Sequence, residues 1–233
     1  MMQEKINKQI AITTIFLIVV ICIFEFTDLD IFIQSFFYDF NTKTWLIDKN
    51  EPILKLFFYD GFKKIFILFS ILILISLIFF RKTNLIKEYK KGLLIVLLST
   101  IFVPTIVVSL KNNTNTPCPC NLATFGGDYP NIKVFDSYPK DFIQESKIKC
   151  WPAGHASMGF SLMALFFLFK TASNQKKALI TSIILGFITG SYKMLLGDHF
   201  LSHTLVTMIL SWLIILIIVK IIKGKELEKS TKI

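Results

Sequence analysis

Charged residues are scarce in this chain. They make up 18% of the 233 residues, whereas about a quarter is usual in a soluble domain. Hydrophobic residues reach 53%, and the mean hydropathy is +0.61. So few charges cannot cover the surface of a water-soluble domain of this length. The composition therefore excludes that class and indicates an integral membrane protein.

Long apolar stretches take the place of the missing charges. Six of them approach the length of about 20 residues that a spanning helix needs. The fourth and fifth contain Ser, Thr, Gly, His and Lys, which suits helices that face the interior of a bundle. In the fifth, Gly186 and Gly190 form a small-xxx-small pair and predict close helix packing. The sequence thus predicts an all-α, polytopic membrane protein with six transmembrane helices, over residues 10–26, 65–80, 93–110, 153–169, 179–196 and 200–222.

Basic residues gather in alternate connections between these stretches. They occur before the first, after the second, after the fourth and after the sixth, and basic loops stay in the cytoplasm. Both termini are therefore expected to be cytoplasmic, with segments 27–64 and 111–151 on the opposite side. We expect one membrane domain over residues 1–223, followed by a basic, disordered tail over residues 224–233.

The chain also lacks a signal-peptide cleavage site, an internal repeat and a folded basic face. Phe24, Glu25, Phe26 and Thr27 follow the first apolar stretch in place of small residues, so we interpret that stretch as an uncleaved span. The net charge of +10 is accounted for by topology and by contact with anionic lipids. Membrane lipids are the partners that this pattern predicts. It indicates no nucleic acid and no obligate protein partner.

Four cysteines are divided between the first span and one external segment. Cys22 lies within the span and is interpreted as a small apolar filler. Cys118, Cys120 and Cys150 lie in segment 111–151, where an oxidising compartment permits disulfides. A bridge from Cys150 to Cys118 or Cys120 would tether the start of the fourth span to the end of the third. Free thiols and a Cys-x-Cys zinc site are the alternatives, although this segment has no histidine.

The chain has only three histidines, and all lie at the same predicted membrane face as two lysines. His155 is at the start of the fourth span, where free backbone N–H groups form an anion site. His199 and His203 are four residues apart, hence on one face if the turn is helical. Lys111 ends the third span and Lys193 the fifth. A lysine ammonium binds phosphate, although it lacks the fork of arginine. The set favours chemistry on a phosphate group.

Three motifs built on these residues resemble the signature of the type 2 phosphatidic acid phosphatase superfamily. That signature reads Lys-x6-Arg-Pro, Pro-Ser-Gly-His and Ser-Arg-x5-His-x3-Asp. The order, the spacing and the six-helix topology match, and the resemblance covers the third to the sixth span. Segments 125–128 and 156–160 also look like the bacterial lipid A phosphatase branch. The motifs of this chain are Lys111-x6-Cys118-Pro119, Pro152-Ala153-Gly154-His155 and Ser191-Tyr192-Lys193-x5-His199-x3-His203.

The resemblance implies a mechanism that requires no metal or other cofactor. His199 matches the nucleophile, which attacks phosphorus in line and forms a phosphohistidine. His155 matches the general acid that protonates the leaving oxygen and later the base that activates water. His203 stands at the position of the residue that orients the nucleophile. The phosphate-binding positions that the resemblance implies are Lys111, Cys118, Ala153, Gly154, Ser191 and Lys193.

Four of these positions depart from the family pattern. An imidazole at position 203 can accept a proton from the ring of His199, but it stabilises an imidazolium less than a carboxylate does. Asp198 is adjacent to His199 in sequence and poorly placed as a substitute, whereas Asp128 or Asp136 could reach in from the external segment. The departures are Cys118 and Lys193 in place of arginine, Ala153 in place of serine and His203 in place of aspartate.

These expectations combine into a lipid phosphatase of the bacterial cytoplasmic (inner) membrane, with its active site facing the periplasm. A lipid A-like phosphate is the first candidate substrate, followed by undecaprenyl diphosphate and phosphatidylglycerol phosphate. Three alternatives remain open: a non-catalytic binder of lipid phosphates, a lipid phosphotransferase, and a metal-dependent hydrolase. In the last, zinc would be held by His155, His199 and His203.

Overall fold

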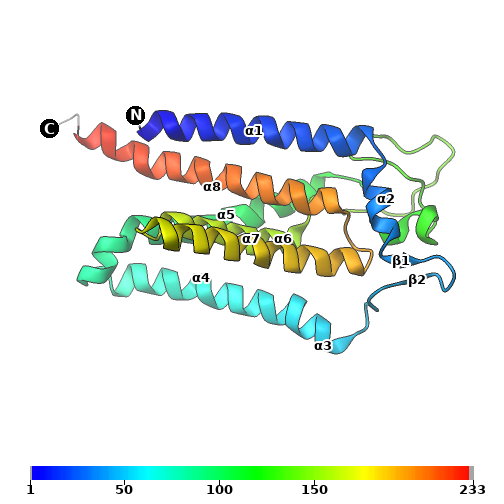
Figure 1. Ribbon diagram of the computed structural model, residues 1–233, viewed down its shortest axis with the longest axis horizontal. Helices are drawn as coiled ribbons and strands as arrows, with labels where there is room; N and C mark the ends of the chain where they lie inside the picture. Colours follow the sequence, from blue (N-terminus) through cyan, green and yellow to red (C-terminus); the bar gives the residue numbers. More distant parts are fainter. Residues whose placement is uncertain (1, 231–233) are drawn as a thin grey trace.

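The computed structural model of the chain describes residues 2–230 and is a bundle of long helices (Figure 1). Short elements connect the helices at one end of the bundle, where a two-stranded antiparallel hairpin pairs Tyr38 with Trp45. In chain order the elements are α1 (Met2–Phe26), α2 (Leu29–Ser35), β1 (Tyr38–Asp39), β2 (Thr44–Trp45), α3 (Pro52–Lys55), a π-helical turn (Leu56–Gly61), α4 (Phe62–Phe79), α5 (Asn84–Asn113), 3-10 turns (Pro119–Asn121 and Ala123–Phe125), α6 (Gly154–Ser161), a 3-10 segment (Leu162–Phe167), α7 (Ala172–Leu195) and α8 (Leu201–Ser230).

Five helical segments are long and apolar enough to cross a membrane, judged by length and composition. They contain five of the six predicted spans and cover Gln3–Phe26, Pro52–Phe79, Asn84–Asn113, Ala172–Leu195 and Leu201–Gly224. The predicted fourth span forms a shorter apolar helix, Gly154–Phe167, whose second half is 3-10 helix. The mostly helical, membrane-type architecture is thus confirmed. The helix α8 continues to Ser230, through part of the tail for which we predicted disorder, and residues 231–233 lie outside the described part.

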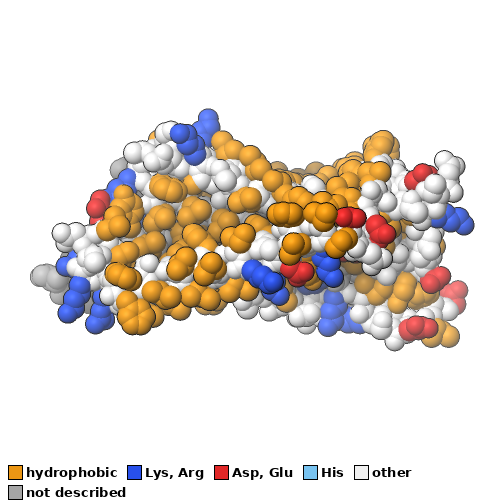
Figure 2. All heavy atoms as spheres, turned by 90° about the horizontal axis from the view of Figure 1, so that it is seen from below, with side chains coloured by type: hydrophobic (Ala, Val, Ile, Leu, Met, Phe, Trp, Pro, Cys, Tyr) orange, Lys and Arg blue, Asp and Glu red, His pale blue; other side chains and the backbone are white. Residues whose placement is uncertain are grey.

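Both ends of the described chain lie at the same end of the bundle (Figure 1). The opposite end carries α2, the hairpin and the long connection between α5 and α6. Figure 2 shows hydrophobic side chains covering much of the flank between these ends, with lysines and arginine prominent at the end that holds the termini. Large apolar side chains are exposed along the long helices, as at Ile15 of α1 and at Ile65 and Phe79 of α4. Exposed apolar surface of this extent fits contact with lipid.

The short helix α6 lies inside the bundle, packed against α5, α7 and α8. Its residues from Ala156 to Ser161 are all buried. Two glycines allow α6 and α7 to approach closely: a Cβ at Gly159 would lie 2.6 Å from the Cα of Gly186. Gly190 gives the same access to α8, because a Cβ there would lie 2.5 Å from the Cγ2 of Thr204. The predicted close packing at Gly186 and Gly190 is confirmed, and it fixes α6 between its neighbours.

Candidate active site

The loop between α7 and α8 carries His199. This loop is held by contacts with the hairpin, with α2 and with the segment that contains Cys120. Gly197 has a φ of 73°, and a Cβ there would lie 2.3 Å from the Trp45 ring of the hairpin. Only glycine adopts this backbone conformation at no steric cost. The Gly197 carbonyl accepts a hydrogen bond from the N–H of Cys120, and the buried Gln34 amide of α2 donates to the carbonyl of Met194. The loop is therefore fixed from outside the bundle.

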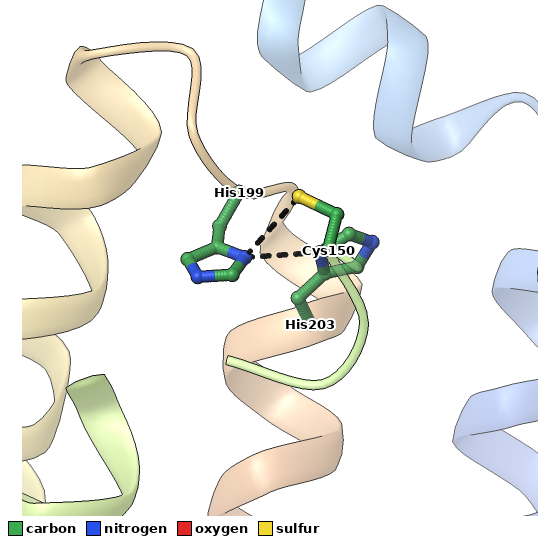
Figure 3. A group of neighbouring side chains, drawn as sticks. All are labelled: Cys150, His199 and His203. Carbon is green, nitrogen blue, oxygen red and sulfur yellow. Dashed lines mark hydrogen bonds between the residues drawn. The ribbon is translucent and has the colours of Figure 1, made fainter. Parts of the chain in front are cut away.

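His199 and His203 form a buried pair, with 3.2 Å between their Nδ1 atoms (Figure 3). Because α8 begins at Leu201, His199 lies in the loop, and the expected single helical face does not apply. A hydrogen bond between two Nδ1 atoms needs one proton. When His199 donates it, the Nε2 of His199 keeps a free lone pair, as a nucleophile requires.

Burial, followed by the electrostatic influence of His203, Lys111, Lys193 and His155, lowers the pKa of His199 well below its usual range. The imidazole of His199 is consequently neutral at physiological pH. These four residues, all predicted from the motifs, therefore lie close to His199. A neutral imidazole beside the ammonium groups of Lys111 and Lys193 is a favourable environment for a phosphate.

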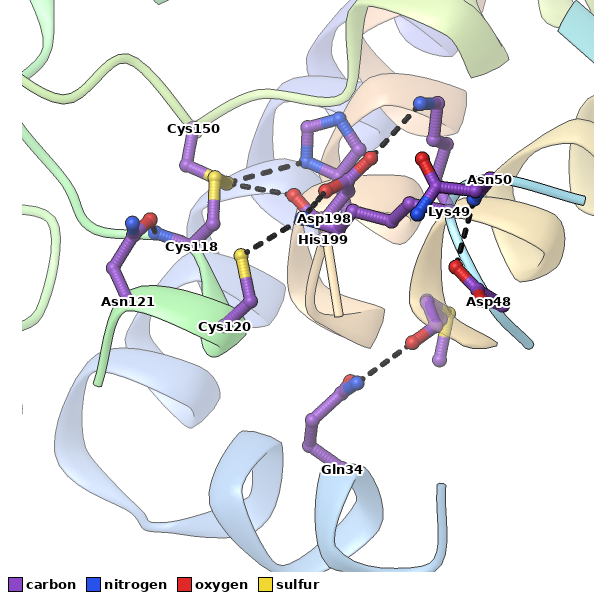
Figure 4. A network of polar contacts seen from close by, with 12 residues as sticks. Gln34, Asp48, Lys49, Asn50, Cys118, Cys120, Asn121, Cys150, Asp198 and His199 are labelled. Atoms are coloured by element: carbon purple, nitrogen blue, oxygen red, sulfur yellow. Dashed lines mark hydrogen bonds and ion pairs between the residues drawn. A yellow bond between two sulfur atoms is a disulfide. The ribbon is translucent and has the colours of Figure 1, made fainter. Parts of the chain in front are cut away.

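Lys193 reaches this cluster in an ion pair with Asp198, the residue next to His199. The Nζ of Lys193 lies 2.9 Å from Oδ2 of Asp198, and the Nζ of Lys49 lies 2.8 Å from Oδ1 of the same carboxylate. Figure 4 shows Asp198 and Lys49 beside His199. Burial favours the neutral form of Asp198, but these hydrogen bonds and charges outweigh it and lower the pKa of Asp198. Asp198 is therefore an anion between two lysines, and it does not orient His199.

Lys49 was missed by the sequence reasoning. It lies in the external segment 27–64, and its Nζ is 3.3 Å from the Sγ of Cys120, two residues after Cys118. Burial opposes its charge, yet the hydrogen bond to Asp198 prevails, and the pKa of Lys49 is raised. Lys49 thus brings a cation close to the position where the family has an arginine. No motif spacing signals this residue, because it precedes the first motif by more than sixty residues.

His155 is held at the start of α6 by an aromatic ring. It stacks on Tyr59 with 4.1 Å between the ring centroids, and the Nζ of Lys193 lies 4.6 Å from the centre of the same ring. The Nε2 of His155 is buried, and no described protein group hydrogen-bonds to it. A buried ring nitrogen normally has a partner. Its free nitrogen is therefore suited to a group that a substrate would bring.

Lys111 and Gly154 meet at the N-terminus of α6. A Cβ added at Gly154 would lie 4.0 Å from the Cδ of Lys111, so the lysine stem runs beside this helix start. The first N–H groups of α6 have no acceptor within the helix and face this position. The N–H of Ala153 is not among the free donors, because it is bonded to the Oγ1 of Thr207 at 2.9 Å. The expected contribution of the Ala153 amide to phosphate binding is therefore corrected, and the donors begin at Gly154.

Two other predicted phosphate-binding positions, Cys118 and Ser191, make none of the contacts that join the histidines and lysines. Cys118 is bonded to Cys150 in a disulfide, which confirms one of the two predicted pairings and commits the sulfur of Cys118 to that bond. Cys120 is free. Ser191 is exposed on α7 and takes part in none of the contacts described above. The structure thus brings His155, His199, His203, Lys111 and Lys193 together, but not Ser191.

The residues that the structure describes contain one group able to hold a metal ion, and it differs from the predicted one. It consists of Cys150, His199 and His203, whose potential ligand atoms lie within 4.8 Å of one another. His155 is not part of it. The sulfur of Cys150 is held in the disulfide, and a disulfide sulfur is a poor ligand compared with a thiolate.

Asp30 was also missed, and it lies behind the histidine pair. Asp30 of α2 and His203 line a cavity of about 40 Å³, large enough for water. The Oδ1 of Asp30 accepts a hydrogen bond from the N–H of Ser202 at 3.0 Å. Burial raises the pKa of Asp30 to about 6, against the hydrogen bonds from Ser202 and the charge of Lys133, which lower it. Neither Asp128 nor Asp136, considered from the sequence, lines this cavity.

This carboxyl group is expected to make stability depend on pH. Between about pH 4 and 6 the folded protein holds a proton on Asp30 that the unfolded chain releases, so acidification through this range stabilises the fold. We expect the free energy of unfolding in detergent to rise by on the order of 1 kcal/mol between pH 7 and pH 5. Asp30→Asn should remove the rise, whereas Asp28→Asn, at an exposed carboxylate, should keep it. An unchanged pH profile in Asp30→Asn would contradict the assignment.

The bundle and this cluster indicate an integral membrane protein with a cluster of histidines and lysines at one end. A family model described as the PAP2 superfamily matches residues 92–226, more than half of the chain. The chain belongs to the PAP2 superfamily, whose members are phosphatases, and the protein is accordingly a phosphoric monoester hydrolase. The match includes all three motifs. Neither a search of curated proteins nor a search of solved structures found a match to the chain.

Proposed function

We propose that the protein removes phosphate from a lipid at the outer face of the bacterial cytoplasmic membrane, through a phosphohistidine on His199. The observation that carries this proposal is the buried, neutral His199 in the positive field of Lys111 and Lys193, at one end of an apolar bundle. Apolar helices bring the site to lipid, and loose phosphoryl-transfer transition states need mainly positioning and positive charge.

The chemistry follows from the hydrogen bonds of the site. His199 donates from Nδ1 to His203, and its Nε2 attacks phosphorus while the bond from phosphorus to the lipid oxygen breaks. His155 gives its proton to that oxygen and then takes one from the water that hydrolyses the phosphohistidine. Lys111, Lys193 and the amides from Gly154 onward neutralise the phosphoryl oxygens.

The membrane topology that we propose has six spans, with α6 and its 3-10 extension as the short fourth. The two termini would be cytoplasmic, residues 1–223 would form one membrane domain with 224–233 as a basic tail, and the site would face the periplasm. A lipid A-like phosphomonoester is the first substrate to test, followed by undecaprenyl diphosphate and phosphatidylglycerol phosphate.

The direct test is phosphate release by the purified protein in detergent, from a panel of these lipid phosphates, with and without EDTA. Release that resists EDTA and requires His199 supports the proposal and identifies the substrate. Binding of a lipid phosphate with no release would favour a binder. A new phospholipid with little free phosphate would favour a phosphotransferase, and release that EDTA abolishes would favour a metal-dependent hydrolase.

Lys49 is expected to bind phosphate in place of the missing arginine. A hydrogen bond to a charged group contributes roughly 1.5–3 kcal/mol, so Lys49→Gln should lower kcat/KM by roughly 10- to 100-fold. Most of the loss should appear as a higher KM. Lys55→Gln is the matched control, because Lys55 is an exposed lysine of the same segment. Equal kcat/KM values for the two variants would show that Lys49 has no role in binding.

A further inference from the structure

We infer that reduction of the Cys118–Cys150 disulfide creates a transition-metal site from Cys150, His199 and His203, and that the bound metal inactivates the nucleophile. Only one part of this inference rests on the proposed function, namely that His199 is the nucleophile. The metal site itself depends on the positions of three side chains.

Two of the three separations between the ligand atoms match a tetrahedral zinc centre, and all three atoms lie within 4.8 Å of one another. Zinc bonds of about 2.0–2.1 Å to nitrogen and 2.3 Å to sulfur place two nitrogen ligands about 3.3 Å apart, and a nitrogen and a sulfur about 3.6 Å apart. The two Nδ1 atoms of His199 and His203 are 3.2 Å apart, and the Sγ of Cys150 lies 3.7 Å from the Nδ1 of His199. Figure 3 shows the sulfur and both rings converging on one place. The fourth position remains available for water.

The disulfide determines whether this site exists. In the oxidised protein the sulfur of Cys150 has its second bond to Cys118 and carries no thiolate charge. Cys150 is completely buried, whereas Cys118 is only half-buried. An external thiolate therefore has access to the sulfur of Cys118, and its attack releases Cys150 as the leaving thiolate.

The redox step is a thiol–disulfide exchange with a dithiol. The first thiolate of the dithiol forms a mixed disulfide with Cys118, and its second thiol resolves that bond. The dithiol becomes a cyclic disulfide, and both protein cysteines become reduced. A divalent metal ion then binds the sulfur of Cys150, which releases the thiol proton to water. The same ion binds the imidazoles of His199 and His203.

Metal binding removes the nucleophile by fixing a tautomer. A neutral imidazole that gives its Nδ1 lone pair to a metal carries its proton on Nε2. The Nε2 of His199 then has no lone pair with which to attack phosphorus. The metal also takes the acceptor atom of His203, to which His199 would otherwise donate. The disulfide thus keeps the histidine pair in its catalytic tautomer when metal ions are present.

The experiment uses Cys118→Ser/Cys120→Ser, which leaves Cys150 free without a reductant and prevents a bridge to Cys120. Titration of this full-length variant with Co²⁺ in detergent should give one equivalent of tetrahedral cobalt with a thiolate-to-cobalt absorption band. The matched control, Cys118→Ser/Cys120→Ser/Cys150→Ser, lacks both the disulfide and the thiolate, and it should give no such band. A band of equal strength in this control would overturn the inference.

The same Co²⁺ titration of oxidised and reduced wild-type protein tests the inference if the variants do not fold. Oxidised wild type should show no thiolate band with Co²⁺, and protein reduced with a dithiol and then freed of it should show one. Absence of the band in reduced wild type would also overturn the inference. In reduced protein, one equivalent of Zn²⁺ should lower phosphate release at least about a hundredfold, by analogy with the loss of the correct histidine tautomer in other enzymes. EDTA should restore it.

The two readouts separate this inference from the proposed function. The cobalt band in the absence of any phosphate release would support the metal site and contradict the proposed phosphatase activity. Phosphate release without the cobalt band would contradict the metal site, and so would release that Zn²⁺ leaves unchanged in reduced protein. Both outcomes would remain consistent with the proposed phosphatase activity.

Discussion

His199→Ala is expected to reduce phosphate release at least about a thousandfold, because removal of a covalent nucleophile leaves only binding and electrostatic stabilisation. His199 is buried, and Lys111, Lys193 and His155 lie close enough to influence its protonation. The measurement is phosphate release from the best lipid substrate in detergent. In parallel, ³²P-labelled substrate should label the wild-type protein with an acid-labile phosphate, and His199→Ala should stay unlabelled.

Two controls keep this result interpretable. The unfolding temperature of His199→Ala should stay close to that of the wild type, since His199 lies in a loop that Trp45, Gln34 and Cys120 hold through its neighbours. Lys55→Gln should release phosphate at the wild-type rate. Retention of more than a tenth of the activity by a folded His199→Ala protein would exclude the phosphohistidine route.

Gly186→Ala is expected to have the largest effect on stability. A Cβ at this position would lie 2.2 Å from the Cδ1 of Phe160, and the ring of Phe160 is completely buried between α6 and α7. Because the ring cannot move away, the helices must separate, and overpacking of this kind costs typically about 1–3 kcal/mol and occasionally more. We expect a loss of about 3 kcal/mol in the free energy of unfolding, with a clear fall in the unfolding temperature.

Gly224→Ala is the matched control for this substitution. A Cβ at Gly224 would meet only the side-chain nitrogen of Gln3 at 3.7 Å, which is an ordinary contact. Alanine has the higher helix propensity, so this variant should be as stable as the wild type or slightly more stable. If both variants unfold at the same temperature, α6 and α7 do not approach as closely as described.

The long helices could be predicted because lipid imposes length and apolarity on every span. The runs at 10–26 and 93–110 lie within α1 and α5, and the run at 200–222 begins one residue before α8. The predicted fourth span, 153–169, corresponds to the shorter apolar helix Gly154–Phe167, whose shortness was not foreseen. The apolar run 153–169 continues beyond Ser161 without a proline or glycine, yet the helix tightens there into a 3-10 segment. Hydropathy does not distinguish these two helix types.

The site was predictable where the motif residues themselves make the contacts. His199, His203 and Lys193 come together because the short loop after α7 brings them together. Lys49, Tyr59 and Asp30 could not be predicted, because their positions depend on how the external segment folds over the bundle. The amide of Ala153 was misjudged for the same reason: its acceptor, Thr207, belongs to a helix whose packing partner the sequence does not specify.

The Asp198 bridge between Lys49 and Lys193 has a consequence for discrimination among lipids. The site contains a counter-ion of its own, the carboxylate of Asp198, which directly precedes His199 in the chain. A phosphodiester headgroup has a single negative charge. Its attraction to Lys49 and Lys193 would therefore be no stronger than that of the Asp198 carboxylate with which it competes. A terminal phosphomonoester has a second ionisation at a pKa of about 6 and therefore carries nearly two charges at neutral pH. The competition favours the dianion, so the abundant diesters of the surrounding bilayer would be rejected by charge before shape is tested.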